Sequence, residues 1–158
     1  MSRAAQGSAG SLPVAAQGGP TSYAIFRVAR SHHLLARRLL QAVGLHPGQE
    51  MVMMHLWEAG PQRQVDLVNV LDGDAAAMTR TLARLERAGF VRRSQSAADR
   101  RTTIVESTAA GHALRDEVER LWHQLEELTV ASLTSEERTA LAQLLLKLDV
   151  HLTELLSD

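Results

Sequence analysis

The side chains best suited to binding a charged partner are arginines gathered in one segment. Between Arg63 and Arg101 there are eight arginines and five acidic residues, a net charge of +3. From Ser107 to Asp158 there are four basic and ten acidic residues, although the whole 158-residue chain carries a net charge of only −1. A basic segment beside an acidic one is typical of a protein whose basic lobe faces nucleic acid. The alternative, that both segments are solvated helix faces, stays open on charge alone.

The histidines raise the hypothesis of a metal site. None of the seven lies in a recognised ligand spacing such as His-x-x-x-His, and the chain has no cysteine to complete a zinc site. The absence of cysteine also excludes disulfides and thiol-based redox sensing. We therefore expect no metal and no other cofactor, with a metal-responsive regulator kept as an alternative. The histidines are His32, His33, His46, His55, His112, His123 and His151.

Motifs for catalysis are missing from the sequence. There is no glycine-rich phosphate loop, no nucleophile elbow and no acid pair bracketed by strands, so we expect a binding protein and not an enzyme. No apolar run approaches the roughly 18 residues that a membrane-spanning helix needs. Met1 to Pro20 lacks the apolar stretch of a secretory signal. We expect a cytoplasmic protein without a membrane partner.

The elements that position these arginines are mostly helices. Aromatic residues make up only 3% of the chain while Leu and Ala dominate, which favours helix packing over a sandwich of strands. Apolar residues at three- and four-residue spacing predict helices, and Gly44, Gly60 and Gly89 mark where three of them end. We expect a flexible tail over 1–20 and helices over about 22–43, 47–60, 63–71 and 74–88, with a tight turn at Asp72-Gly73 before an N-cap at Asp74.

The pattern changes after this fourth helix. Residues 90–94 and 102–106 are rich in β-formers and flank a polar link over 95–101, which predicts a two-stranded antiparallel ribbon. Thr108 caps a long helix that follows, and Thr134 with Glu137 forms a capping box that opens the last helix. Leucine stripes on these two helices have the spacing of helices that pack along their length.

The order helix, helix, turn, helix, ribbon is the plan of a winged helix-turn-helix. Over about residue 22 to the C-terminus the chain also resembles the MarR family, whose members are prokaryotic dimeric transcription regulators. No single motif is decisive, but the run from Leu67 to Gly111 matches without a gap. The matching residues are Gly60-Pro61, Leu67, Leu71, Met78-Thr79-Arg80, the segment 85–91, Asp99-Arg100-Arg101, Val105 and 108–111.

This resemblance implies a mainly α fold with a small antiparallel β-hairpin wing. It implies a single domain over 21–158, with a wing-helix lobe at about 47–106. The terminal helices, about 22–43 and 108–156, would form the interface of a homodimer. The function expected is that of a sequence-specific regulator, most simply a repressor, bound to a palindromic operator in double-stranded DNA. The alternatives are a sequence-independent DNA-binding structural protein and a purely structural helical dimer.

The helix over 74–88 is the expected recognition helix. Its small residues Ala75, Ala76 and Ala83 share a face with Thr79 and Arg80, so the helix can seat deeply in the major groove, about 12 Å wide. Arg84 lies at the edge of that face, while Met78, Leu82 and Leu85 are expected to face the core. Solvated arginines are the alternative for Arg80 and Arg84. The full DNA-binding set that we expect is Arg63, Gln64, Ala75, Ala76, Thr79, Arg80, Arg84, Arg92, Arg93, Asp99, Arg100 and Arg101.

The hairpin is expected to enter the minor groove. A guanidinium on a thin ribbon suits a narrow A·T-rich groove, where the potential is most negative. By resemblance Arg101 reads the groove, Asp99 orients it and Arg100 touches the backbone. Arg92 and Arg93 are expected to add phosphate contacts.

The sequence departs from the family pattern at the helix-turn-helix. Ala76 and Ala77 stand where relatives usually carry Ser and Thr, and Arg63 stands where a capping Ser or Thr is common. Two hydroxyl contacts are therefore missing, which implies an unusual operator preference.

A small anionic effector is also expected by resemblance, because relatives often bind phenolic carboxylates between the dimer helices and the DNA-binding lobe. Four residues of the first helix would border this cleft, with guanidinium forks for a carboxylate. They are Arg27, Arg30, His33 and Arg37, with His32 beside them. A role at the dimer rim or in solvent is an equal alternative for all of them.

Overall fold

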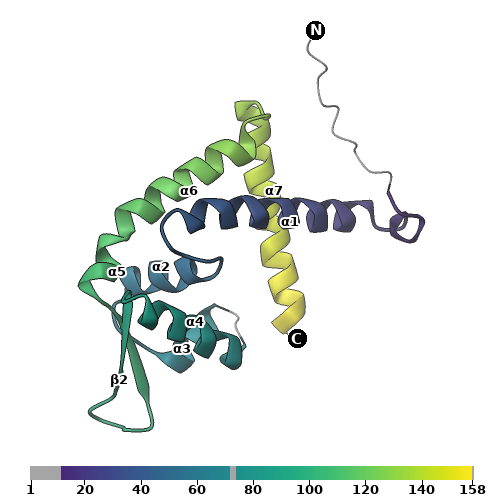
Figure 1. Cartoon of the computed structure of the whole chain (residues 1–158). Helices are drawn as coiled ribbons and strands as arrows, with labels where there is room; N and C mark the ends of the chain where they lie inside the picture. The colour runs from purple at the N-terminus through teal and green to yellow at the C-terminus, as the bar shows by residue number, and fades with distance from the viewer. Residues whose placement is uncertain (1–11, 72–73, 158) are drawn as a thin grey trace.

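The computed structural model describes residues 12–71 and 74–157. Within these ranges the chain is mainly helical, with one small antiparallel sheet, as the sequence predicts. Figure 1 shows the short helices and the strands gathered in one lobe, with the long helices lying mostly outside it. Most of the expected tail and the expected turn at Asp72-Gly73 lie outside the described residues. No helix in the described ranges combines the length and the apolar character that a membrane span needs.

The first long helix, α1 (Pro20–Gln41), begins two residues earlier than expected. Proline at its first position is favourable because its fixed φ suits a helix and its missing N–H would have no partner there. A short 3-10 turn, η1 (Val14–Ala16), precedes it in the segment that the sequence assigned to the tail. Gly44 follows α1 with a φ of 74°, a conformation that glycine adopts without strain.

Three helices form the centre of the lobe: α2 (Gln49–Ala59), α3 (Gln64–Val70) and α4 (Ala75–Arg87). The predicted N-cap of α4 is confirmed, since the carboxylate of Asp74 accepts hydrogen bonds from the backbone N–H groups of Ala76 and Ala77 at 3.1 and 3.0 Å. These helices share one apolar core with the sheet. Its most deeply buried side chains are Met53, Leu56, Leu67, Leu82, Leu85 and Val105.

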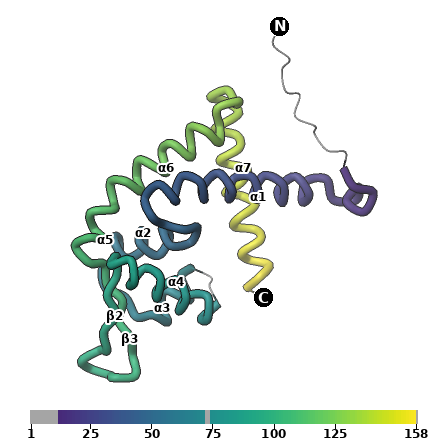
Figure 2. Tube along the Cα trace, viewed as in Figure 1, coloured from purple at the N-terminus to yellow at the C-terminus, as the bar shows by residue number. Residues whose placement is uncertain are grey.

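The sheet has three strands where the sequence predicted two. The predicted ribbon is confirmed as β2 (Val91–Gln95) and β3 (Thr103–Ser107), which run side by side in Figure 2. The additional strand, β1 (Gln62–Arg63), pairs with β3 on its other edge, with Arg63 opposite Ile104. The predicted start of α3 at Arg63 was therefore wrong by one residue, because Arg63 has extended backbone and belongs to the strand.

The helices after the sheet also differ from the expectation in one place. The single helix expected after Thr108 is broken at Leu114 into α5 (Ala109–Ala113) and α6 (Arg115–Val130). The caps themselves are confirmed: the Thr108 hydroxyl accepts a hydrogen bond from the Gly111 N–H at 3.1 Å. Thr134 and Glu137 bond each other's backbone N–H groups at the start of α7 (Ser135–Ser157).

Close packing at α5 joins the lobe to the long helices. The indole N–H of Trp57 on α2 donates a hydrogen bond to the carbonyl oxygen of Gly111 at 3.2 Å. A Cβ on Gly111 would fall onto the carbonyl oxygen of Phe90 and would lie 2.6 Å from the hydroxyl of Ser107. Gly111 is therefore required by contact, because α5 lies too close to the sheet for any side chain at that position.

Candidate nucleic-acid interface

The helix α4 presents two different faces. Met78, Leu82 and Leu85 are buried, as the sequence predicts, and fix the helix against the core. The opposite face is open to solvent over more than two turns. Its exposed residues are Ala75, Ala76, Thr79, Arg80 and Arg84, with Ala83 half-buried beside them. This small-residue face with two arginines is the shape that a major groove admits.

A polar contact braces α4 against α3. The hydroxyl of Thr79 donates to the carbonyl oxygen of Ala75 at 2.8 Å and accepts from the side-chain amide of Gln64 at 3.1 Å. Gln64 is the first residue of α3, so this contact fixes the spacing between the two helices. The Thr79 hydroxyl has its proton engaged and can offer only an acceptor to a base edge or a bridging water.

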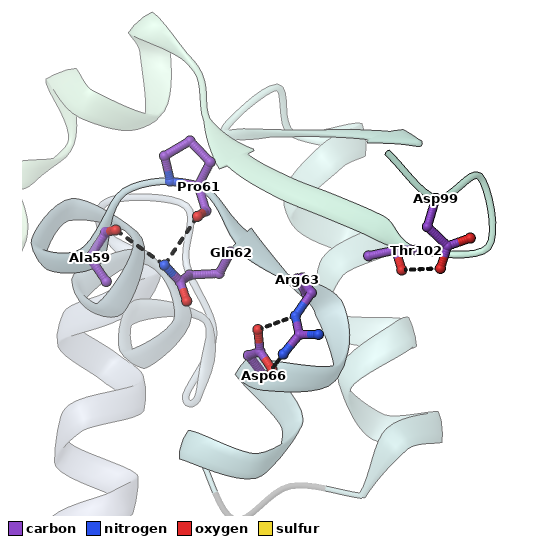
Figure 3. Close-up of polar contacts among 7 residues, drawn as sticks. All are labelled: Ala59, Pro61, Gln62, Arg63, Asp66, Asp99 and Thr102. Carbon is purple, nitrogen blue, oxygen red and sulfur yellow. Dashed lines mark hydrogen bonds and ion pairs between the residues drawn. The ribbon is translucent and has the colours of Figure 1, made fainter. Parts of the chain in front are cut away.

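The hairpin is organised by Asp99. One carboxylate oxygen of Asp99 accepts from the backbone N–H of Arg101 at 2.9 Å, and the other accepts from the Thr102 hydroxyl at 3.0 Å, the second contact being drawn in Figure 3. These hydrogen bonds, the backbone one foremost, hold the pKa of Asp99 below its ordinary value. The expectation was that Asp99 orients Arg101. The contact in the structure is with the backbone of Arg101 and sets the turn that presents its side chain.

A shallow hollow of about 330 Å³ lies where α3, α4 and the base of the hairpin meet. Arg63 lines it from β1, Gln64 from the start of α3, Ala75 from the start of α4, and Arg101 from the hairpin. Four of the predicted DNA-binding residues thus come together although 38 positions separate the first from the last. The helix α4 and the hairpin therefore contribute to one continuous surface.

Three of the predicted arginines are held by carboxylates. Arg63 makes a two-pronged contact with Asp66, with both N–O distances at 2.7 Å, drawn in Figure 3. Hydrogen bonding to Asp66, with its charge second, raises the pKa of Arg63 above its ordinary value. Arg92 pairs with Glu106 across the ribbon, at 2.5 Å. A paired guanidinium has less net charge to offer a phosphate, because its partner cancels part of the field.

The third pair joins α4 to the sheet. The guanidinium of Arg93 contacts Glu86 at 2.5 and 2.9 Å, and the Arg93 backbone N–H donates to the same carboxylate at 3.1 Å. The hydrogen bond from the Arg93 side chain is the main cause that lowers the pKa of Glu86. Sequence reasoning assigned Arg93 a phosphate contact and missed Glu86. Glu86 and Arg93 are seven residues apart on either side of a turn. That separation has no fixed geometry, so no local sequence pattern predicts the pair.

The other four arginines of the predicted set keep their charge uncompensated. Arg80 and Arg84 on α4, and Arg100 and Arg101 on the hairpin, are exposed and form no ion pair with any residue that the structure describes. Two lie on the helix and two on the wing. The positive charge that remains available therefore lies on the exposed sides of α4 and of the hairpin.

The residues expected to bind an effector are divided by the structure. Arg27 lines a hollow of about 430 Å³ between α1 and Thr129, and His33 lines a second hollow of about 400 Å³ between α1, the start of α2 and α6. His32 borders both hollows. Arg30 and Arg37 are exposed and line neither. Within 12–71 and 74–157, no cluster of three or more His, Asp or Glu residues could hold a metal ion.

Comparison with known proteins finds similarity to transcription regulators of the MarR family. The model of the MarR family matches residues 45–103, which span α2, α3, α4 and β2. The HTH-type transcriptional repressor NicR of Pseudomonas putida is 34% identical over 100 residues, which are 63% of this chain. The alignment spans 63% of NicR, so a third of that relative has no counterpart in the match.

Two solved structures share the fold over nearly their whole length. A mutant of MarR from E. coli, complexed with operator DNA, superposes with a TM-score of 0.77 and 27% identity, covering 85% of this chain and 97% of that one. BpsR of Bordetella bronchiseptica, whose DNA binding is regulated by 6-hydroxynicotinic acid, gives a TM-score of 0.73 and 26% identity. That superposition covers 81% of this chain and 97% of BpsR.

Proposed function

The chain belongs to the MarR family, and from this premise we propose that it is a transcription regulator that binds duplex DNA as a homodimer. The helix α4 enters the major groove and the hairpin of β2 and β3 enters the adjacent minor groove. The observation that carries the proposal is the convergence of α3, α4 and the hairpin on one surface whose arginines at positions 80, 84, 100 and 101 carry uncompensated charge. The DNA complex of the similar MarR mutant supports it.

The homodimer is supported by the state of the last helix. None of the residues of α7, Ser135–Ser157, is buried, although the helix carries a stripe of leucines. An apolar surface of this length on one helix marks an interface, and a second copy of the same chain supplies a matching stripe. Exposed apolar residues of α1, such as Ile25 and Phe26, extend the surface. We propose that α1, α6 and α7 form the dimer interface.

Repression and release complete the proposal. NicR is a repressor, and BpsR is regulated by an aromatic carboxylate, so we propose that this chain represses transcription and is released by an effector of that class. Such an effector would occupy the hollows that Arg27, His32 and His33 border. It acts by favouring a spacing of the two recognition helices that does not fit the operator.

The central test is competition binding with the upstream DNA of the gene itself and with random duplexes. We expect an imperfect palindrome with half-sites about 10 base pairs apart, roughly 34 Å, because twofold-related helices enter successive major grooves. Arg80→Ala should cost about 1–3 kcal/mol and relax preference at one position. Arg101→Ala should weaken sites with A·T-rich flanks most. Arg87→Ala, an exposed arginine near the end of α4 that is outside the predicted DNA-binding set, serves as the control for loss of one positive charge.

Two results would reject this assignment. Unchanged affinity of Arg101→Ala on every duplex would show that the hairpin is not a DNA-binding wing. Equal affinity for random and upstream DNA would favour the sequence-independent alternative.

The effector is tested separately by a thermal-shift screen with salicylate-like compounds. Binding should raise the melting temperature of the wild type, and Arg27→Ala and His33→Ala should reduce the shift. The same compounds should lower DNA affinity. Equal shifts in the wild type and both variants would remove these residues from the effector site.

A further inference from the structure

Glu50 lies in a position that its charge makes costly. It is the second residue of α2, the residue is only 7% exposed, and it lines the hollow of about 400 Å³ between α1, the start of α2 and α6. Its Oε2 atom is buried and has no hydrogen-bond partner among the residues that the structure describes. A buried carboxylate oxygen without a donor is rare in folded proteins, because the desolvation is then uncompensated.

The surroundings of Glu50 only partly offset this cost. Burial raises the pKa of Glu50, while the backbone at Glu50 and Gly48 and the nearby charge of His33 act in the opposite direction. These opposing contacts leave Oε2 with the capacity to accept a hydrogen bond. A molecule bound in the hollow can supply the donor that Oε2 lacks.

The walls of the hollow indicate what kind of molecule would bring that donor. Ala29, Ala36 and Leu125 give it an apolar lining, and Trp122 adds an aromatic surface. The remaining polar side chains are His32 and His33. An apolar hollow with a few polar groups binds a small, mostly apolar ligand and fixes its orientation through those groups.

We propose that Glu50 determines the specificity of this hollow, by accepting a hydrogen bond from an N–H or O–H group on the ring of an aromatic carboxylate and by excluding a second carboxylate from that end. This inference rests on the proposed effector response and deepens it. The carboxylate of the ligand faces His32 and His33, and the ring donor faces Glu50. A hydrogen bond to an ionised acceptor is roughly twice as strong as one between neutral groups, so this contact dominates the choice among ligands of similar shape.

The test uses three probes of one frame: benzoate, 4-hydroxybenzoate and terephthalate. They place hydrogen, a donor and a second carboxylate at the same ring position. Calorimetric titration of the full chain should rank 4-hydroxybenzoate above benzoate, with terephthalate weakest. In Glu50→Gln the amide can donate to the second carboxylate, so the preference for 4-hydroxybenzoate over terephthalate should fall by about tenfold or more. Glu58→Gln, a carboxylate exposed on the same helix, should leave the ranking unchanged.

Separate measurements distinguish a failure of the role proposed for Glu50 from a failure of the proposed DNA-binding function. Wild-type protein that binds none of the three probes, or that prefers terephthalate, overturns the role of Glu50. An unchanged ranking in Glu50→Gln with a raised melting temperature also overturns it, because Glu50 would then be only a buried charge that costs stability. Operator binding of each variant is measured in parallel. Failure of the wild type to bind DNA rejects the proposed function, whereas the probe ranking is read independently of DNA.

Discussion

Glu86 on α4 and Arg93 on β2 are joined by three hydrogen bonds, two from the guanidinium and one from the backbone N–H of Arg93. The contact ties the C-terminal end of α4, the proposed recognition helix, to the first strand of the hairpin. A backbone N–H cannot move independently of its strand, so the carboxylate fixes the strand itself and not only a side chain. The angle between helix and wing is thereby set within the lobe before any DNA is bound.

Glu86→Gln should weaken operator binding by about tenfold and lower stability by less than about 1 kcal/mol, since the pair is partly exposed. The pKa of Glu86 lies below its ordinary value of 4.5, so the stability that the pair contributes is present above that value. It is lost as the pH falls through the lowered pKa. Urea unfolding should show a larger difference between wild type and variant at pH 7 than at pH 3.5. Glu106→Gln, which frees Arg92 instead, should leave the wing in place, and equal effects of the two variants would contradict the prediction.

Arg92→Ala should weaken binding to all duplexes alike. Arg92 lies on the ribbon and not on α4, so we expect a phosphate contact that carries no sequence information. Its loss should lower the slope of log K against log salt by at most about 0.9, the value for one phosphate, because Glu106 already holds part of the guanidinium charge. Competition binding at two salt concentrations measures this. A loss of affinity confined to one base pair would instead assign Arg92 to direct readout.

Gly111→Ala should destabilise the protein by about 1–3 kcal/mol. In most helices the same change is stabilising by about 1 kcal/mol, because alanine is the better helix former. Here the new methyl would overlap the carbonyl oxygen of Phe90 and lie 2.9 Å from the terminal methyl of Met53. Thermal unfolding decides the sign. Ala110→Gly, at the neighbouring exposed position, should cost only the ordinary helix propensity, and a more stable Gly111→Ala would show that α5 can move away from the sheet.

Leu148→Asp combined with Leu152→Asp should abolish the dimer. Both side chains are largely exposed in the single chain, at 39% and 50%, and lie on one stripe of α7. Charges there would be buried without partners in a dimer, and the result should be monomeric or aggregated protein. Sedimentation at micromolar concentration measures the state, with Gln143→Asp on the opposite face of the helix as the control. A wild type that sediments as a well-behaved monomer would refute the interface.

Much of this fold could be predicted from local sequence signals. The N-caps at Asp74 and Thr108, the box at Thr134 and the ends at Gly44 and Gly89 all act within a few residues, and the structure has them where the sequence predicts them. The bounds of both strands of the ribbon were predicted to within one residue, because two runs of β-forming residues flank a polar link. The choice of the exposed face of α4 followed from helical periodicity alone.

Other features depend on partners that are distant in sequence. The strand β1 has two residues, too few to show a pattern, and exists because Gln62 and Arg63 meet β3 more than 40 positions later. The Glu86 contact needed the path of the turn at Gly89. From the sequence, Glu50 is an ordinary favourable acid near the start of a helix. Its burial beside α1 and α6 appears only in the structure. The sequence also did not predict which arginines form ion pairs, because that depends on where the carboxylates lie in the fold.

The last helix has a consequence for how the regulator responds to its own abundance. In the proposed homodimer, the helical form of α7 would be stabilised mainly by the second copy, because α7 buries no residue within its own chain. Folding of that region and association are then one equilibrium, governed by mass action. At low copy number the amount of competent dimer rises with the square of the chain concentration. A twofold change in synthesis is thus converted into a nearly fourfold change in the species that occupies the operator.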